Sequence, residues 1–199
     1  MPAGDNQMTK ISSLLLTLLV AASMAPDFAA AQEVSEQRIV LGLGKLVGAA
    51  PLIDIAILRQ EAMDGGGVAM ASLPNWGKIA KLPQMVVEID FENDSVMIKP
   101  ESYRSLGLIA DALHHPNLWA YKFLIVGHSS STGSDKHNLE LSEKRAAAIG
   151  EILSTTFAVD PERLYAVGVG EYFPIDGSKG DSASNRRVQL VNLGVFTTP

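Results

Sequence analysis

The pattern of apolar and polar residues changes near residue 84, after which short apolar runs alternate with amphipathic stretches of helical period. In residues 85–91 apolar and acidic positions alternate, as on a strand that buries one face. Residues 123–126 are all apolar, which predicts a strand buried on both faces. The pattern therefore predicts strands over residues 85–91, 123–126, 164–169 and 187–193.

Two stretches between these strands have the spacing of helices. The first starts near Pro100, since proline is tolerated in a first turn, and it ends at His114, shortly before Pro116. The second is a long helix from Asn138, which the pattern predicts as its N-cap, to about Thr156. Helices that alternate with strands predict two layers around one sheet, an α/β (α+β) fold.

The first 31 residues have the three parts of an export signal. Lys10 supplies a basic start, residues 11–25 are mostly apolar, and residues 29–31 are alanines that suit cleavage before Gln32. The apolar run is too short to favour a permanent membrane span, although an uncleaved N-terminal anchor is an alternative. We expect residues 1–31 to be a signal peptide and the protein to be periplasmic, associated with the outer membrane or the cell wall.

Residues 32–83 have the least regular pattern. Their longest apolar stretch is interrupted by Lys45, Pro51 and Asp54, so it does not predict a membrane span. We expect an N-terminal arm that is poorly ordered or depends on a partner, with a short helix or strand near residues 52–58. The regular pattern predicts a domain over residues 84–195 and a tail over residues 196–199.

The composition excludes several classes of function. A formal net charge of −6 without a basic face argues against a nucleic-acid-binding protein. The chain has no cysteine, which excludes disulfides, cysteine–zinc sites, thiol catalysis and the acylation site of a lipoprotein.

The loop between the buried strand and the long helix carries the candidate chemistry. Gly127 and Gly133 bracket this loop, and Asn138 and Arg145 share one flank of the helix's apolar stripe. A cation early in a helix gains nothing from the helix dipole. A guanidinium beside backbone N–H groups would bind an anion of the size of a carboxylate. From spacing alone, Arg145 is as well explained as a solvated surface charge.

Four motifs extend this interpretation. They are Gly-His-x-x-x-x-Gly at residues 127–133, Asn-x-x-Leu-Ser-x-x-Arg-Ala at 138–146, Gly-x-Gly-Glu-x-x-Pro at 168–174 and Asn-Arg-Arg-Val at 185–188. In order and spacing they resemble the OmpA-like C-terminal domain, a family of periplasmic modules that includes peptidoglycan-associated lipoproteins and the wall anchor of the flagellar stator. The resemblance implies a βαβαββ two-layer sandwich with a mixed sheet, which binds the diaminopimelate of the peptide stem non-covalently.

The resemblance also implies the site. The family's ligand arginine falls on Arg145, and its asparagine ahead of the helix on Asn138. The family usually has Gly-His-Thr-Asp, whose aspartate binds the ammonium group of diaminopimelate, but this chain has Ser130 at the aspartate's position. We expect ligand contacts from Arg145, Asn138, Ser130, Ser129, His128 and Asp135, the last in compensation for Ser130. We expect structural support from Gly127, Gly133, Glu171, Asn185, Arg186 and Arg187.

Two other kinds of site fit the sequence less well. Residues 126–129 resemble the start of a hydrolase nucleophile elbow, but that motif needs glycine where Ser131 stands, and the only later histidine is His137. The four histidines lack the H-E-x-x-H spacing of a zinc site. The sequence therefore predicts neither an enzyme nor a metal or cofactor site.

These observations predict a non-enzymatic cell-envelope protein that binds the peptide stem of peptidoglycan. Replacing a carboxylate by the hydroxyl of Ser130 removes a charge-assisted bond worth about 1.5–3 kcal/mol, so weakened or altered ligand preference is expected. The alternative is a periplasmic protein–protein interaction scaffold that has lost diaminopimelate binding. In either case residues 32–83 are a possible contact for an envelope protein partner.

Overall fold

A computed structural model describes residues 35–44, 53–65, 68–175 and 179–195 of the chain. All of these residues belong to one unit that starts at Val34. The predicted signal peptide and the predicted tail lie outside the described residues.

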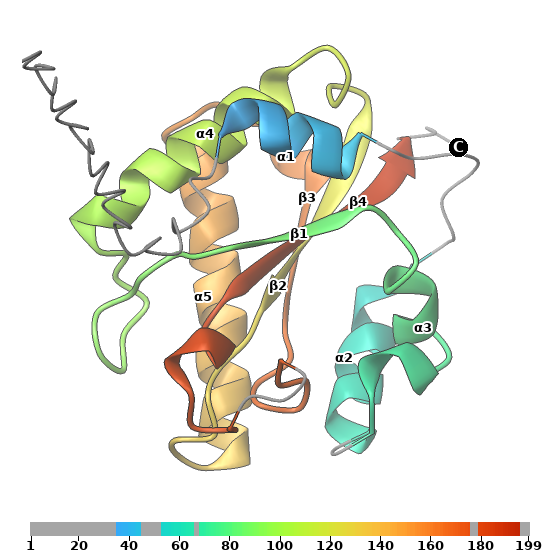
Figure 1. Ribbon diagram of the computed structural model, residues 1–199, viewed down its shortest axis with the longest axis vertical. Helices are drawn as coiled ribbons and strands as arrows, with labels where there is room; N and C mark the ends of the chain where they lie inside the picture. Colours follow the sequence, from blue (N-terminus) through green and yellow to red (C-terminus); the bar gives the residue numbers. More distant parts are fainter. Residues whose placement is uncertain (1–34, 45–52, 66–67, 176–178, 196–199) are drawn as a thin grey trace, which may run out of the picture. The chain divides into compact units, whose positions relative to one another are not determined.

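Four strands form one mixed sheet in the order β1-β4-β2-β3 (Figure 1). They are β1 (Gln84–Val87), β2 (Tyr121–Gly127), β3 (Leu164–Gly168) and β4 (Val188–Val195). β2 and β3 are parallel, and β4 runs antiparallel to both β1 and β2. With helix α4 (Tyr103–His114) after β1 and helix α5 (Asp135–Thr155) after β2, the order from residue 84 onward is βαβαββ, which confirms the predicted mixed fold.

The first strand is shorter than the alternation predicts. β1 ends at Val87, and Phe91 forms only an isolated antiparallel bridge with Ile98. The N–H of Lys99 donates to the carbonyl of Asp90 at 2.9 Å, so residues 88–99 form a small hairpin of their own instead of continuing the ladder with β4.

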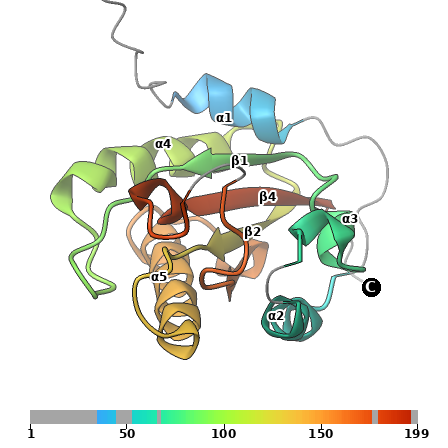
Figure 2. The ribbon, with the colours of Figure 1, turned by 60° about the horizontal axis from the view of Figure 1, so that its bottom comes forward.

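One face of the sheet is covered by α4 and α5, and helix α1 (Glu36–Leu43) packs beside α4 (Figure 2). Side chains from the three helices share a core with the residues of the strands that point to this face, such as Val87, Phe123 and Leu190. The side-chain amide of Asn192 donates to the carbonyl of Leu43 at 2.8 Å, which attaches the end of α1 to β4.

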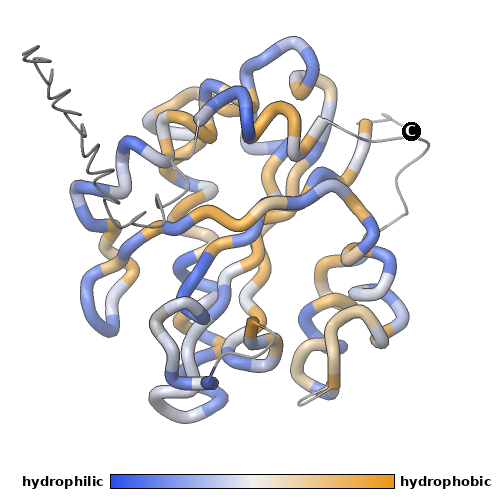
Figure 3. Tube along the Cα trace, in the orientation of Figure 1, coloured by the Kyte–Doolittle hydropathy of each residue, from blue (hydrophilic) through white to orange (hydrophobic). Residues whose placement is uncertain are grey.

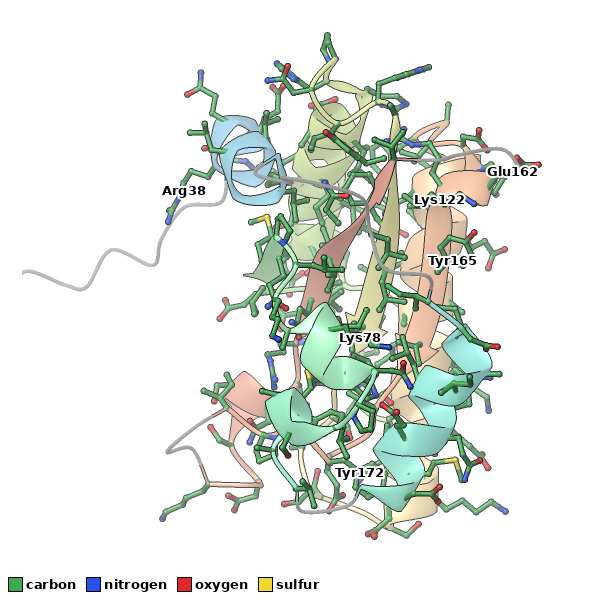
Figure 4. All side chains as sticks on the ribbon, turned by 90° about the vertical axis from the view of Figure 1, so that its right-hand side faces the viewer. Arg38, Lys78, Lys122, Glu162, Tyr165 and Tyr172 are labelled. Carbon is green, nitrogen blue, oxygen red and sulfur yellow. The ribbon has the colours of Figure 1, made fainter. Side chains whose placement is uncertain are left out.

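The opposite face is covered by residues that precede β1. Helix α2 (Ile55–Asp64), a 3-10 turn (Met70–Ser72) and helix α3 (Trp76–Ile79) lie in front of the sheet in Figure 4. Their buried side chains form a second core with the strand residues that point to this face: Leu124, Val126, Val167, Val191 and Leu193.

The expectation of a poorly ordered arm over residues 32–83 is therefore wrong for the described part of that segment. Leu43, Leu58 and Trp76 are fully buried, and residues on both sides of position 84 share the two cores. Of the short helix or strand expected near residues 52–58, the structure has a helix, α2, which runs from Ile55 to Asp64. The physical reason is tertiary, because short amphipathic helices become stable when they pack on a sheet face.

Figure 3 shows hydrophobic residues along the central strands and hydrophilic residues interspersed along the helices. No helix within the described segments combines the length and the apolar character that crossing a membrane would require.

Candidate functional site

The long helix starts earlier than predicted. Its N-cap is Ser134, whose hydroxyl accepts a hydrogen bond from the N–H of His137 at 3.3 Å. Ser134 has extended backbone angles, as an N-cap requires, and the helix proper begins at Asp135. Asn138 is therefore in the first turn and not at the cap, and Arg145 lies well inside the helix instead of near its start.

Two glycines let α5 lie directly on the ends of the parallel strands. Gly127 ends β2 and Gly168 ends β3, and the two are paired in the sheet. A Cβ on Gly127 would lie 2.2 Å from the carbonyl oxygen of Ser142, and one on Gly168 would lie 2.2 Å from the backbone nitrogen of Glu143. This close approach places the face of α5 that carries Asn138 and Arg145 beside the loops that follow the strands.

The loop after β3, residues 169–175, holds the loop after β2 and the start of α5. The carbonyl of Gly170 accepts the N–H of Ser129 at 2.9 Å. The Glu171 carboxylate accepts a hydrogen bond from the side-chain amide of Asn138, which is itself buried. Asn138 and Glu171 are thus bound to each other inside the fold.

The same loop is attached to residues 185–187. The guanidinium of Arg187 donates to the carbonyl of Phe173 at 3.0 Å, and the Asn185 side chain accepts the N–H of Ile175 at 2.9 Å. The Asn185 amide also donates to the carbonyl of Lys179 at 2.8 Å. These contacts attach the 169–175 loop and Lys179 to the residues that lead into β4.

His128 is buried and neutral. Its Nε2 lies 3.1 Å from the Oε1 of Gln189. Burial, and secondarily the positive charge of Arg187, lowers the pKa of His128 to about 3. A histidine with such a pKa carries no charge at neutral pH, so it contributes shape and hydrogen bonding instead of electrostatic attraction.

The two serines after His128 are buried as well. Ser130, 2% exposed, has its hydroxyl 3.0 Å from the hydroxyl of Thr132. The hydroxyl of Ser129 has no hydrogen-bond partner among the described residues.

Arg145 is 7% exposed, yet no carboxylate in the described part of the chain forms an ion pair with it. Its Nε donates to the carbonyl of Ser95 at 2.9 Å and its Nη2 to the carbonyl of Glu92 at 3.3 Å, and its guanidinium lies 4.8 Å from the centre of the Phe91 ring. Burial is the main cause that lowers the pKa of Arg145, followed by the charge of Arg186, while Asp94 acts in the opposite direction.

A cavity of about 570 Å³ opens beside this guanidinium. Arg145 and His128 border it, whereas Asn138, Ser129, Ser130 and Asp135 are not among its lining residues. The lining carries both signs of charge: four cations, Lys99, Arg145, Arg186 and Arg187, and three acids, Glu88, Asp90 and Glu92.

The acidic side of the cavity was missed by the sequence interpretation. The signal was present as the alternation of acidic and apolar positions in residues 88–92, but alternation alone indicates a half-buried strand and not a binding surface. Asp135, expected near the ligand, is instead the exposed first residue of α5.

A surface hydrogen bond flanks the same region. The Nε2 of His137 lies 2.7 Å from the Oδ1 of Asp94, which joins the start of α5 to the turn that Arg145 holds. Within the described residues no group of three or more histidine, aspartate or glutamate side chains is placed to hold a metal ion.

Known proteins are similar to this sequence. The model of the OmpA family matches residues 90–187. Outer membrane protein A of Bordetella avium is 30% identical over 194 residues, which cover 94% of this chain and 98% of that protein. This chain belongs to the OmpA family.

Two further similarities cover different shares of the chain. The peptidoglycan-associated lipoprotein of Pseudomonas putida is 32% identical over 166 residues, which are 76% of this chain and 98% of that protein. The solved OmpA-like domain of FopA1 from Francisella tularensis is 19% identical, with a TM-score of 0.48 over 57% of this chain and 77% of that one.

Other relatives are much longer than this chain. The alignments span only 32% and 34% of the outer membrane porins F of Pseudomonas aeruginosa and Pseudomonas fluorescens.

Proposed function

We propose that this OmpA-family protein binds the peptide stem of peptidoglycan non-covalently, in the cavity beside Arg145. The observation that carries the proposal is a buried guanidinium without a carboxylate partner in the described chain, at the wall of a cavity that carries both signs of charge. The name of the relative from Pseudomonas putida, a peptidoglycan-associated lipoprotein, supports the choice of ligand.

In this proposal Arg145 binds a carboxylate of the ligand. A guanidinium has five N–H groups, and the carbonyls of Ser95 and Glu92 each accept from Arg145. The N–H groups that remain suit a planar carboxylate, and a charge-assisted bond of this kind is about twice as strong as a neutral one. Held by those carbonyls and by the Phe91 ring, the side chain is already ordered before a ligand arrives.

The ammonium group of a diaminopimelate stem would need a different partner from the family's aspartate. Ser130 offers only a neutral, buried hydroxyl that already interacts with Thr132. The carboxylates of Asp90 and Glu92 lie at the same cavity. We therefore propose an altered preference, in which the ammonium group turns toward residues 88–92 or is absent from the bound ligand.

The contacts of the site also support a non-enzymatic role. A serine nucleophile needs a base within hydrogen-bond reach, but the Ser129 hydroxyl has no partner among the described residues. The Nε2 of His128 is used by Gln189, and His137 is paired with Asp94 at the surface. We place the protein in the cell envelope, exported by residues 1–31 and associated with the outer membrane or the cell wall.

The proposal is tested by titrating the full chain with a diaminopimelate-containing muropeptide, beside a double variant with Asp90→Asn and Glu92→Gln. Both residues border the cavity, so we expect the loss of their charges to weaken binding by about tenfold or more. Asp111→Asn is the matched control, because it removes a charge from an exposed position of α4 that does not border the cavity. If the double variant binds no more weakly than Asp111→Asn, the placement of the ammonium group at residues 88–92 is wrong.

A second candidate function is a protein–protein scaffold of the envelope. Large apolar side chains on α1 and α2 are exposed: Leu41, Ile57 and Met63 are 67%, 48% and 46% accessible. Such side chains on the N-terminal helices favour an envelope protein as partner. Pull-down from envelope extracts separates the two candidates: a stoichiometric partner that the Arg145→Ala variant retains, without muropeptide binding by the wild type, favours the scaffold.

A further inference from the structure

The α2–α3 segment is built around one tryptophan. Trp76 is fully buried, and its indole N–H donates to the carbonyl of Leu58 at 2.8 Å. The Glu61 carboxylate accepts the backbone N–H groups of Asn75 at 3.0 Å and Trp76 at 3.2 Å. The ring is therefore fixed by its own hydrogen bond and by the backbone that carries it.

Trp76 touches the loop that holds the candidate site. Its ring centre lies 5.6 Å from that of Phe173, with the planes tilted by 58°. This separation lies in the favourable range for aromatic pairs. Phe173 is buried in the second core with Leu58 and Ile79, so the N-terminal helices fix the side chain of a residue in the 169–175 loop.

The backbone of this loop then holds the residues at the cavity. The carbonyl of Phe173 accepts a hydrogen bond from the guanidinium of Arg187 at 3.0 Å. Arg187 and His128 both border the proposed ligand cavity. Gly170 in the same loop accepts the N–H of Ser129.

Two more features connect the N-terminal segment to the site. Arg59 of α2 forms an ion pair with Glu143 of α5, the helix that also carries Arg145. Arg187 also borders a second cavity of about 670 Å³, whose walls come from residues 68–71 and 172–175 among others.

We propose that residues 53–82 position the ligand site, with Trp76 as the positioning residue that acts through Phe173 on Arg187 and on the loop after β2. This inference rests on the proposed function for its effect on binding. Residues 53–82 lie outside the region that matches the OmpA family, and in this proposal they keep the 169–175 loop in its binding geometry.

The positioning is tested without ligand by amide hydrogen exchange in the full chain. The N–H groups of Ser129 and His128 report the loop, since they donate to Gly170 and Arg187. We expect Trp76→Leu and Phe173→Leu to speed the exchange of these two amides by about tenfold more than the loss of global stability alone would. We expect Trp76→Phe, which keeps a ring contact with Phe173, to exchange like the wild type.

Leu153→Ala is the matched control, because Leu153 is fully buried in the core on the opposite face. Equal acceleration in Leu153→Ala and Trp76→Leu, at equal loss of global stability, would mean that Trp76 acts on stability alone and would overturn the proposal. Protection of both amides that is unchanged in Trp76→Leu would overturn it as well.

The effect on binding is tested by titrating the same variants with the diaminopimelate-containing muropeptide. We expect Trp76→Leu to bind about tenfold more weakly, and Leu153→Ala to bind like the wild type. Equal affinity of Trp76→Leu and the wild type contradicts the positioning role. A wild type that does not bind the muropeptide contradicts the proposed function. The hydrogen-exchange experiment, which needs no ligand, then still tests whether Trp76 positions the loop.

Discussion

Arg145 shows how one residue serves the fold and a candidate site together. Its guanidinium holds the turn at residues 92–95 through two carbonyls and covers the Phe91 ring. A buried cation without an anionic partner is costly unless its N–H groups are satisfied, and the two carbonyls meet only part of that demand. We propose that a carboxylate of the ligand accepts hydrogen bonds from the remaining N–H groups of Arg145.

His128 predicts a pH dependence of stability. Its pKa is about 3 in the fold, mainly because of burial, against 6.5 in an exposed histidine. The unfolded chain binds the proton more readily than the folded one. The contribution of neutral His128 to the free energy of unfolding is therefore complete above about pH 6.5 and is lost as the pH falls toward 3. We expect the free energy of unfolding to fall by about 2 kcal/mol more between pH 6 and pH 4 in the wild type than in His128→Gln.

Urea denaturation at each pH measures this difference. His115→Gln is the control, because His115 lies at the end of α4 and is not fully buried. A wild type and a His128→Gln variant with parallel pH profiles would show that His128 is accessible to protons in the folded state, contrary to the structure.

At the scale of elements, the contact between α5 and the parallel strands depends on the absence of side chains. Gly168→Ala would place a Cβ 2.2 Å from the Glu143 backbone nitrogen, and a backbone cannot turn away as a flexible side chain can. We expect this substitution to lower the free energy of unfolding by about 3 kcal/mol, as overpacking does.

Gly107→Ala in α4 is the matched control, since its Cβ would meet the Phe157 ring at an ordinary 3.7 Å. Alanine is the better helix former, so we expect this variant to be more stable than the wild type by about 0.5–1 kcal/mol. Urea midpoints of both variants test the pair. A Gly168→Ala protein as stable as the wild type would contradict the close approach of α5 to β3.

The sequence predicted the elements whose apolar residues recur with a clear period, and it missed the residues at which some of these elements begin or end. The buried run at residues 123–126 and the long helix are found within a few residues of their predicted places. Ser134, rather than Asn138, caps the helix, because both residue types suit that position and the pattern cannot choose between them. The alternation of residues 85–91 continues past β1 into a hairpin, since period alone does not reveal where a ladder ends.

At the scale of the whole molecule, the largest difference concerns the N-terminal helices. Residues 36–43, 55–64 and 76–79 fold onto both faces of a sheet whose strands lie later in the chain. Their short apolar stretches are weak signals by themselves, and only the sheet provides the surface that they bury. The candidate site was predicted through Arg145 and His128, whereas its acidic wall and its support by Trp76 depend on contacts between distant segments.

The central claim is that Arg145 binds a carboxylate of the peptidoglycan stem. Titration of the full chain with a diaminopimelate-containing muropeptide tests it, with Arg145→Lys compared to Arg163→Lys. Arg163 is also a buried arginine, but it donates to the carbonyls of Tyr121, Leu113 and Leu118 away from the cavity. We expect Arg145→Lys to weaken binding by about tenfold or more, because lysine lacks the bidentate fork, and Arg163→Lys to bind like the wild type. Equal affinities of Arg145→Lys and the wild type would contradict the account.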